Sequence, residues 1–283
     1  MTMLLDGKRI AGDIRAQVRA NVDSLKSHGI EPALALVVAT DDESAAWYVR
    51  SLGSAAEKVG MATRLADLGA SATEDDLRAE LARFAVDPGV HGIILQSPLP
   101  KGVHADALFS AIPPEKDVDG ANPLSAGRVM AGLPAFAPAT ASAVMELLEA
   151  YEVPLNGARA VVVGRSMVVG KPVAHLLLAA NATVTICHSR TRDLAEVTRQ
   201  ADVLVAAIGK PRFFGSEHLK PGATVIDVGT TPDDDGKLVG DVDANAVQGV
   251  AGALTPVPGG VGPVTTALLL KNAASAATPA SRQ

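Results

Sequence analysis

The chain has 283 residues, of which 48% are hydrophobic and 20% charged, and this profile excludes a mostly disordered protein. A formal net charge of −6 excludes a basic nucleic-acid-binding surface, and a single cysteine, Cys187, excludes internal disulfides and cysteine-based zinc clusters. No apolar run is long enough to cross a bilayer, and the first ten residues contain no apolar core of a signal peptide. We therefore expect a cytoplasmic protein with no metal site and with no nucleic-acid or membrane partner.

Apolar runs of strand length alternate with segments of helical period in the first half of the chain. This pattern is typical of parallel βαβ units and predicts an α/β fold. In chain order it predicts a helix, then three strands separated by two helices: Gly7–His28, Ala33–Ala39, Ser44–Val59, Met61–Asp67, Glu74–Val86 and Gly92–Gln96. The segment 113–138 has five prolines and little periodicity, so we expect an irregular functional loop there.

A helix at Thr140–Tyr151 opens the second half, and the alternation of strands and helices then resumes. Four strands are expected, and glycines occur in the turns that follow them. A segment rich in proline and glycine, Thr255–Pro263, leads into a last helix at Val264–Ala277. The four strands are Ala160–Val163, Thr183–Cys187, Val203–Ala207 and Thr224–Val228.

The first of these strands ends in a glycine turn that precedes a helix. The turn begins at Gly164, and the helix begins near Gly170. Free backbone N–H groups and the helix dipole make such a turn a ready site for a phosphate. It is not the usual dinucleotide fingerprint, because Ser166 occupies the position of the second glycine, and it is not a Walker A loop, because Pro172 replaces the magnesium-binding hydroxyl. A turn that only packs a helix on a strand remains the alternative.

The residues after the next strand indicate which dinucleotide the turn would bind. An enzyme that uses NAD usually places an acidic residue there to bind the ribose hydroxyls. This strand ends Cys187-His188-Ser189-Arg190, without an acid. Arg165 and Ser189 instead offer donors for a dianionic 2′-phosphate. The sequence therefore favours NADP over NAD.

Short motifs in both halves point to one family. They are Leu5-Asp6-Gly7-Lys8, Tyr48-Val49, Gln96–Lys101, Lys116–Gly120, Val163–Ser166, Val169-Gly170, Cys187–Ser189 and Thr255–Pro263. In this order and at this spacing they resemble the methylenetetrahydrofolate dehydrogenase/cyclohydrolase family, over nearly the whole chain. The resemblance implies a folate-binding catalytic domain of residues 1–139 with 263–283 and a Rossmann-type NADP-binding domain of residues 140–262. It also implies a cleft at the junction of the domains and a homodimer.

The resemblance further implies roles for individual residues. Tyr48 would stack on the pterin–aminobenzoyl system, Asp119 would hold the pterin ring, and Gln96 would face the reacting carbon. These three are the expected catalytic residues, and the folate would also meet Leu52, Pro98, Pro258, Gly259 and Gly260. The expected cofactor-binding residues are Gly164, Arg165, Ser166, Gly170, His188, Ser189, Gly209, Val228, Gly229 and Thr230. Taken alone, Tyr48 fits a packing residue, Asp119 fits an Asx turn, and Gln96 fits a buried amide.

The sequence departs from the family pattern at one important position. The family has a lysine one helical turn after the tyrosine, and this chain has Leu52 there. Ser97, Ala139, Ala141 and the pair Thr230-Thr231 are further departures. Hydride transfer needs alignment but no obligatory proton-handling side chain. Hydrolysis needs managed proton transfer, and losing a positioned acid or base group typically costs about 100- to 10,000-fold.

We therefore expect an NADP-dependent enzyme that oxidises 5,10-methylenetetrahydrofolate to 5,10-methenyltetrahydrofolate, with impaired or absent cyclohydrolase. The first alternative is the usual bifunctional enzyme, in which Tyr48, Gln96, Asp119 and water replace the lysine and 10-formyltetrahydrofolate is formed. The second is a non-catalytic paralogue that binds NADP or folate.

Overall fold

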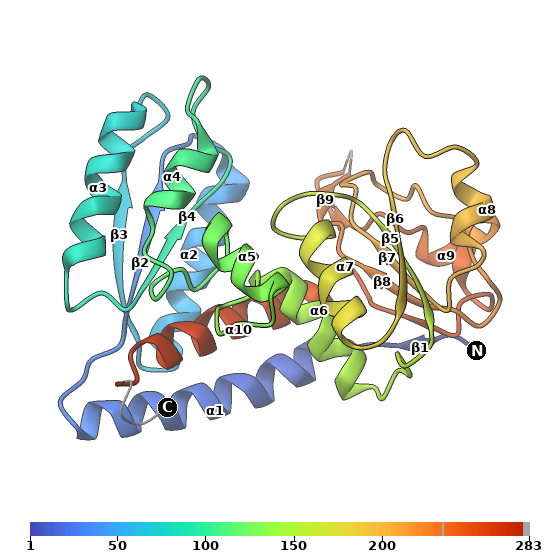
Figure 1. Ribbon diagram of the computed structural model, residues 1–283, viewed down its shortest axis with the longest axis horizontal. Helices are drawn as coiled ribbons and strands as arrows, with labels where there is room; N and C mark the ends of the chain where they lie inside the picture. Colours follow the sequence, from blue (N-terminus) through green and yellow to red (C-terminus); the bar gives the residue numbers. More distant parts are fainter. Residues whose placement is uncertain (234, 280–283) are drawn as a thin grey trace. The chain divides into compact units, whose positions relative to one another are not determined.

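The chain folds into two compact units in the computed structural model, which describes residues 1–233 and 235–279 (Figure 1). Unit 1 consists of Met1–Gly12 and Thr140–Thr265, and unit 2 consists of Asp13–Ala139 and the chain from Thr266 onward. The last four residues of the expected folate-binding domain, 280–283, lie outside the described residues. The predicted α/β fold with parallel sheets is confirmed.

Unit 2 is built on a three-stranded parallel sheet in the order β3-β2-β4. The strands are β2 (Ala33–Val38), β3 (Ala62–Asp67) and β4 (Gly92–Leu95), and all six residues of β2 are buried. The chain leaves β2 for one neighbour and then crosses back to the other. Right-handed crossovers therefore place α2 (Glu43–Lys58) and α3 (Glu74–Val86) on opposite faces of the sheet (Figure 1).

Side-chain caps define where both of these helices begin. Asp42 accepts a hydrogen bond from the backbone N–H of Ala45 at the start of α2, and Thr73 forms a capping box with Asp76 at the start of α3. The other helices that contribute residues to unit 2 are α1 (Gly7–Ser27), α4 (Ala105–Ala111), α5 (Pro123–Met130) and α10 (Val261–Ala276). No helix in the described part of the chain is long and apolar enough to cross a membrane.

The expectation that the segment 113–138 is irregular was wrong for its central part, which forms α5. Asn122 is the N-cap and accepts a hydrogen bond from the N–H of Leu124 at 2.7 Å, and Pro123 occupies the first helical turn. Proline at this position costs nothing, because the N–H that it lacks would have no partner within the helix. A prolyl residue was therefore a start signal here rather than a helix breaker.

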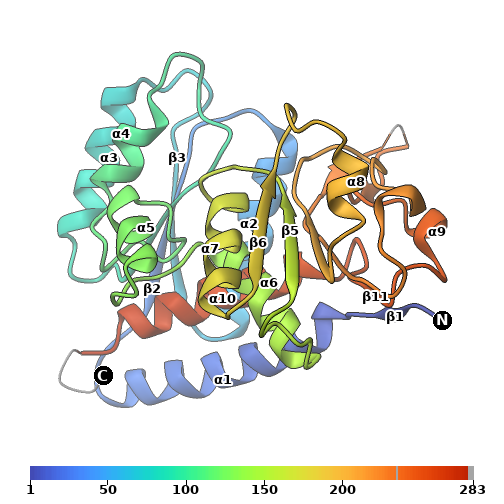
Figure 2. The ribbon, with the colours of Figure 1, turned by 45° about the vertical axis from the view of Figure 1, so that its right-hand side comes forward.

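Unit 1 contains a six-stranded parallel sheet in the order β1-β11-β8-β7-β5-β6. Its helix α7 packs against β5 and β6 (Figure 2). A two-stranded antiparallel ladder, β9 with β10, follows β8 in the chain. The strands are β1 (Met3–Leu4), β5 (Arg159–Val163), β6 (Thr183–Cys187), β7 (Val203–Ala206), β8 (Thr224–Asp227), β9 (Thr231–Pro232), β10 (Leu238–Val239) and β11 (Ala253–Leu254); the helices are α6 (Ala139–Ala150), α7 (Gly170–Ala179), α8 (Leu194–Thr198), α9 (Ala244–Val247) and the 3-10 turn Ser216–His218.

Residues 1–12, which were expected in the folate-binding domain, group with unit 1 in the structure. Met3 and Leu4 form β1, the edge strand of the unit 1 sheet, in register with Ala253 and Leu254 of β11. The backbone N–H of Leu5 then donates to the carbonyl of Leu254 at 2.9 Å. The N-terminal segment therefore joins unit 1 through ladder hydrogen bonds.

Candidate functional site

The carboxyl ends of four strands meet at one edge of the unit 1 sheet. Val163 of β5 is in register with Cys187 of β6 and with Ala206 of β7, and Ala206 is in register with Asp227 of β8. The order of the strands places β6 on one side of β5 and β7 on the other. Ligands of open α/β sheets bind at such a switch point, beyond the carboxyl ends of the strands. All ten predicted cofactor-binding residues follow these strand ends.

The turn after β5 requires glycine at both of its ends. Gly164 has φ of +137°, and a Cβ atom there would lie 2.2 Å from the carbonyl oxygen of Ala207. A Cβ on Gly170 would lie 2.3 Å from the carbonyl oxygen of Gly164. Ser166 accepts a hydrogen bond from the N–H of Gly170 at 3.3 Å, at the first residue of α7. This close-packed turn presents backbone and a helix N-terminus, as a phosphate site requires.

The loop after β6 lies beside this turn, because the N–H of Gly164 donates to the carbonyl of Cys187 at 2.9 Å. Within the loop, the N–H of His188 donates to the Thr191 hydroxyl at 2.9 Å. Ser189 is exposed, as is Arg165 in the neighbouring turn. The two loops therefore present hydroxyl and guanidinium donors, and neither carries a carboxylate between residues 164 and 171 or between 187 and 192.

The loops after β7 and β8 carry the remaining predicted cofactor residues. Gly209 is exposed and has φ of +65°, a left-handed conformation that favours glycine. The N–H of Val228 donates to the carbonyl of Ala206 at 2.9 Å, so the two loops begin next to each other. Gly229 is buried and Thr230 is exposed.

The loop with Pro258, Gly259 and Gly260, which were predicted to contact folate, lies in unit 1 and is anchored to the N-terminal residues. The N–H of Gly7 donates to the carbonyl of Gly259 at 2.9 Å, and a Cβ on Gly7 would lie 1.9 Å from the carbonyl oxygen of Gly260. The expected substrate residues are therefore divided. Pro258, Gly259 and Gly260 belong to unit 1, and the others belong to unit 2.

In unit 2 the structure brings Tyr48 and Asp119 together. Burial raises the pKa of the Tyr48 phenol, and the negative charge of Asp119 raises it further, while a hydrogen bond to Thr266 opposes both effects. Tyr48 is therefore a neutral phenol at physiological pH, which can donate a hydrogen bond but cannot act as a base. Thr266, at the start of the returning chain, was not predicted from the sequence.

The carboxyl group of Asp119 has a raised pKa. Burial raises its pKa to about 7, and the charge of Asp117 adds to this effect. A pKa near the working pH is the value that suits a general acid or base. Among the described residues, no hydrogen bond to the Asp119 side chain offsets the cost of burial.

Asp117, not Asp119, has the turn role that the sequence left open. The buried carboxylate of Asp117 accepts hydrogen bonds from the N–H of Ala121 at 2.9 Å and from the N–H of Asn122 at 3.0 Å. It thereby connects the motif to the residues that lead into α5. The Asx-turn interpretation is therefore excluded for Asp119 by geometry, and its carboxyl group stays available.

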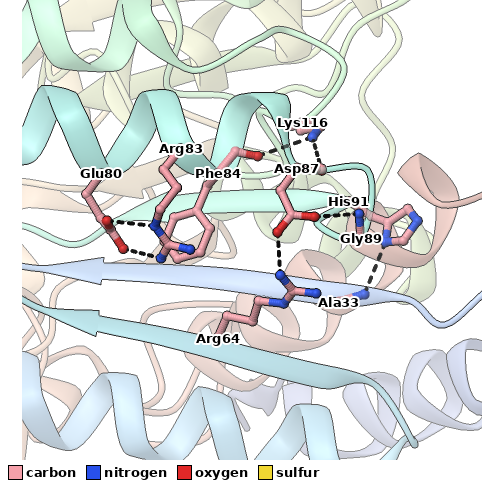
Figure 3. Close-up of polar contacts among 9 residues, drawn as sticks. All are labelled: Ala33, Arg64, Glu80, Arg83, Phe84, Asp87, Gly89, His91 and Lys116. Carbon is pink, nitrogen blue, oxygen red and sulfur yellow. Dashed lines mark hydrogen bonds and ion pairs between the residues drawn. The ribbon is translucent and has the colours of Figure 1, made fainter.

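The lysine of the same motif holds it against the end of α3. Lys116 Nζ donates to the carbonyls of Phe84 at 3.2 Å and Asp87 at 2.7 Å, and the Asp87 carboxylate forms an ion pair with Arg64 (Figure 3). A cation there satisfies terminal carbonyls and complements the helix dipole. Lys116 is thus a structural anchor immediately before the acidic residues.

Gln96 lies where the sequence predicted, directly after β4. Its N–H donates to the carbonyl of Val37 at 2.9 Å, and its side-chain amide donates to the carbonyl of Ser97 at 2.6 Å. Its side chain is half-buried, so the interpretation as a fully buried amide is excluded. Pro98 is exposed after a cis peptide bond.

Leu52 belongs to the buried stripe of α2, which also includes Ala45, Val49 and Ala56. Its side chain is 1% exposed. Tyr48, one turn earlier, is half-buried at the side of this stripe. The position that carries a lysine in the family pattern is therefore filled by a core leucine.

The raised pKa of Asp119 predicts a pH-dependent cost to stability. Because the folded-state pKa of about 7 exceeds the ordinary value of 3.8, the native state holds more protons than the unfolded state between these values. The free energy of unfolding should therefore fall as pH rises from 4 to 7. We expect Asp119→Asn to raise Tm at pH 8 by a few degrees and to change it much less at pH 4. Asp23→Asn, an exposed position in α1, is the control for thermal melts, and equal effects of Asp119→Asn at both pH values would contradict the prediction.

Comparison with known families supports this arrangement. Residues 5–119 match the model described as the tetrahydrofolate dehydrogenase/cyclohydrolase catalytic domain, and residues 138–281 match the NAD(P)-binding domain of the same family. The chain belongs to this family. The predicted family is confirmed, and so is the nicotinamide class of its cofactor.

Relatives in this family match the chain over nearly its whole length. The bifunctional protein FolD 1 of Saccharopolyspora erythraea is 57% identical over 277 residues, which cover 98% of this chain and 94% of the relative. The bifunctional FolD structure from Campylobacter jejuni has a TM-score of 0.95 at 41% identity and covers 98% of this chain and 99% of its own. The Trypanosoma brucei methylenetetrahydrofolate dehydrogenase-cyclohydrolase, solved with NADP and an inhibitor, has a TM-score of 0.95 at 37% identity. The match covers 100% of this chain and 99% of the Trypanosoma brucei chain. These names favour the bifunctional alternative over an enzyme that has only the dehydrogenase.

Proposed function

We propose that this chain is a bifunctional enzyme that oxidises 5,10-methylenetetrahydrofolate with NADP and hydrolyses the methenyl product to 10-formyltetrahydrofolate. The observation that carries the proposal is Asp119 beside Tyr48 in unit 2, because a carboxyl group with a pKa raised to about 7 would supply the proton handling that a lysine at position 52 would otherwise provide. The relatives named as bifunctional support the second activity.

The residues of unit 1 fit the cofactor by their chemistry. The glycines Gly164 and Gly170 let the turn after β5 pack closely at the N-terminus of α7, where backbone N–H groups and the helix dipole would bind a pyrophosphate. Arg165 and Ser189 would bind the 2′-phosphate, and the absence of a nearby acid removes the usual partner of the NAD ribose. Gly209, Val228, Gly229 and Thr230 would line the nicotinamide side. When bound, the nicotinamide accepts the hydride from the methylene carbon of the folate.

The residues of unit 2 would hold the folate and manage protons. Tyr48 would stack on the pterin–aminobenzoyl system, and Asp119 would bind the pterin ring, with Gln96 facing the reacting carbon. In hydrolysis a water oxygen bonds to the methenyl carbon and loses a proton to the Asp119 carboxylate. The carbon then carries a hydroxyl group. As the bond between this carbon and the ring nitrogen breaks, the ring nitrogen gains a proton and the hydroxyl loses its proton to solvent, which leaves the formyl C=O on the other nitrogen and releases one proton overall. Pro258, Gly259 and Gly260 would contribute from unit 1. We further propose a cytoplasmic homodimer, which sedimentation of the purified protein would test.

One pair of assays on the purified protein tests the proposal. NADPH formation with methylenetetrahydrofolate measures the dehydrogenase, and decay of methenyltetrahydrofolate absorbance above the buffer rate measures the cyclohydrolase. Both activities are expected. Hydride transfer with hydrolysis at the buffer rate would restore the interpretation as a dehydrogenase without cyclohydrolase, and loss of both would indicate a non-catalytic paralogue.

Cofactor preference provides a separate prediction. We expect a higher kcat/KM with NADP than with NAD, and Arg165→Ala should reduce that preference by about tenfold, because a charge-assisted contact to phosphate contributes roughly 1.5–3 kcal/mol. The kcat/KM with NAD should change little. Arg159→Ala, an exposed arginine at the start of β5, is the control. Equal kcat/KM for both cofactors in the unmodified enzyme would contradict the assignment.

A further inference from the structure

Two buried aspartates lie at the end of β8 and shortly after β10. In the part of the chain that the structure describes, their carboxylates accept hydrogen bonds from backbone N–H groups alone. Asp227 is the last residue of β8, and Asp241 follows β10. Their side chains are 3% and 0% exposed. Neither residue was selected from the sequence as part of the site.

Each of the two carboxylates accepts three hydrogen bonds. Asp241 Oδ2 accepts from the N–H of Ile208 at 2.6 Å and of Gly209 at 3.1 Å, and its Oδ1 accepts from the N–H of Lys210 at 2.7 Å. These donors form the loop after β7. Asp241 therefore holds three consecutive amides of a loop that lies beyond the sheet ladder.

Asp227 connects the loop after β8 to the segment that carries Asp241. Its Oδ1 accepts from the N–H of Gly229 at 3.0 Å and of Asp241 at 2.9 Å, and its Oδ2 accepts from the N–H of Val242 at 2.9 Å. Its own N–H donates to the Thr255 hydroxyl at 2.7 Å. The loop at 208–210, the loop at 228–229 and the segment at 241–242 are thus joined through two side chains.

Glycines leave room for these carboxylates. A Cβ on Gly240 would lie 1.8 Å from Asp227 Oδ2, and a Cβ on Gly229 would lie 2.5 Å from both the N and the Oδ1 atoms of Asp241. Backbone and carboxylate oxygens at such distances exclude any larger residue. The segments Asp227-Val228-Gly229 and Gly240-Asp241-Val242 therefore form one packed arrangement.

We infer that Asp227 and Asp241 are positioning residues that hold the backbone of Gly209 and Gly229 in place for the nicotinamide end of the cofactor. This inference rests on the proposed function, which assigns those two glycines to the nicotinamide side. The phosphate end depends on other residues, Gly164, Arg165 and Ser189, whose loops follow β5 and β6. A change at Asp241 should therefore weaken binding of the nicotinamide end of the cofactor and leave binding of the phosphate end unchanged.

The test uses Asp241→Asn and Asp241→Ala with two ligands. Asparagine keeps one acceptor oxygen and turns an NH2 group toward a backbone N–H, and alanine removes all three acceptors. NADP occupies both ends of the site, whereas 2′,5′-ADP lacks the nicotinamide. We expect Asp241→Asn to weaken NADP binding about tenfold and to lower kcat for hydride transfer by a similar factor, because one buried N–H loses its partner. The Kd of 2′,5′-ADP should change less than about twofold, and Asp241→Ala should have larger effects in the same direction.

Asp202→Asn is the matched control, because Asp202 also accepts a backbone N–H, that of Arg159 at 2.8 Å, but at the opposite edge of the same sheet. It should leave both Kd values unchanged. Parallel weakening of NADP and 2′,5′-ADP by Asp241→Asn, or no change in either, would overturn the positioning role. If the unmodified protein binds neither NADP nor 2′,5′-ADP, the proposed function itself fails. If the unmodified protein binds both ligands but Asp241→Asn does not affect them differently, only the positioning role fails. Thermal melts of each variant identify any loss of binding or activity that arises from unfolding.

Discussion

Replacing Asp119 with asparagine should slow hydrolysis of methenyltetrahydrofolate by about 100- to 10,000-fold, the usual loss when a positioned acid or base is removed. An asparagine cannot take or release the proton that a carboxyl group with a pKa of about 7 exchanges at neutral pH. It also loses the charge that would bind the pterin ring, so folate affinity should fall. NADP affinity should stay nearly unchanged, because the proposed cofactor residues lie in unit 1 and Asp119 lies in unit 2.

Three measurements separate these effects. Absorbance decay of the methenyl compound reports hydrolysis, and calorimetry with NADP and with a folate measures the two affinities. Trp47, the single tryptophan of the chain, is exposed next to Tyr48 and provides a fluorescence signal for folate binding. Asp23→Asn serves again as the control. If Asp119→Asn hydrolyses at the unmodified rate, another group transfers the proton. If its folate affinity is unchanged, Asp119 does not bind the pterin ring.

Leu52→Lys is expected to have the largest effect on stability. The leucine is 1% exposed, and a fully buried ammonium shifts its pKa by about 3–5 units toward the neutral form. The corresponding cost of several kcal/mol should lower Tm by about 10 °C or more. In the protein that stays folded, the same lowered pKa makes the lysine a base near neutral pH beside Tyr48. We therefore expect the ratio of hydrolysis to dehydrogenase activity to rise.

Leu52→Met is the matched control, because a swap that conserves volume typically costs less than about 1.5 kcal/mol and adds no proton-transfer group. It should change neither the activity ratio nor Tm by much. An unmodified enzyme that hydrolyses at the buffer rate, together with activity gained in Leu52→Lys, would show that the cyclohydrolase was lost with the lysine. A Leu52→Lys variant with unchanged Tm would show that this side chain reaches solvent.

Much of the candidate site followed from the order of residues along the chain. Both β5 and β6 are short runs rich in β-branched residues, which favour strands, so the end of β6 at Cys187 and the glycine turn after β5 were found correctly. A helix N-cap is also local, and the helix that Thr73 caps was predicted with its observed bounds, Glu74–Val86. Gln96 was placed at a strand end for the same reason. The family motifs then assigned chemistry to these positions.

The roles of the aspartates depended on contacts that local pattern does not encode. Asp117 and Asp119 are two residues apart in one motif, yet the buried carboxylate of the first binds backbone donors and the half-buried second has a raised pKa. Asp227 and Asp241 come together only because β8 and the segment after β10 meet at one sheet edge.

The sequence by itself determined the α/β class, the family, the strands with their glycine turns, and the absence of a lysine at position 52. Only the tertiary structure decided that residues 1–12 belong to unit 1, since β1 is two residues long and pairs with β11 about 250 positions away. The protonation of Asp119 was likewise decided by burial. Desolvation depends on everything packed around a group, and that environment is assembled from segments distant in the chain.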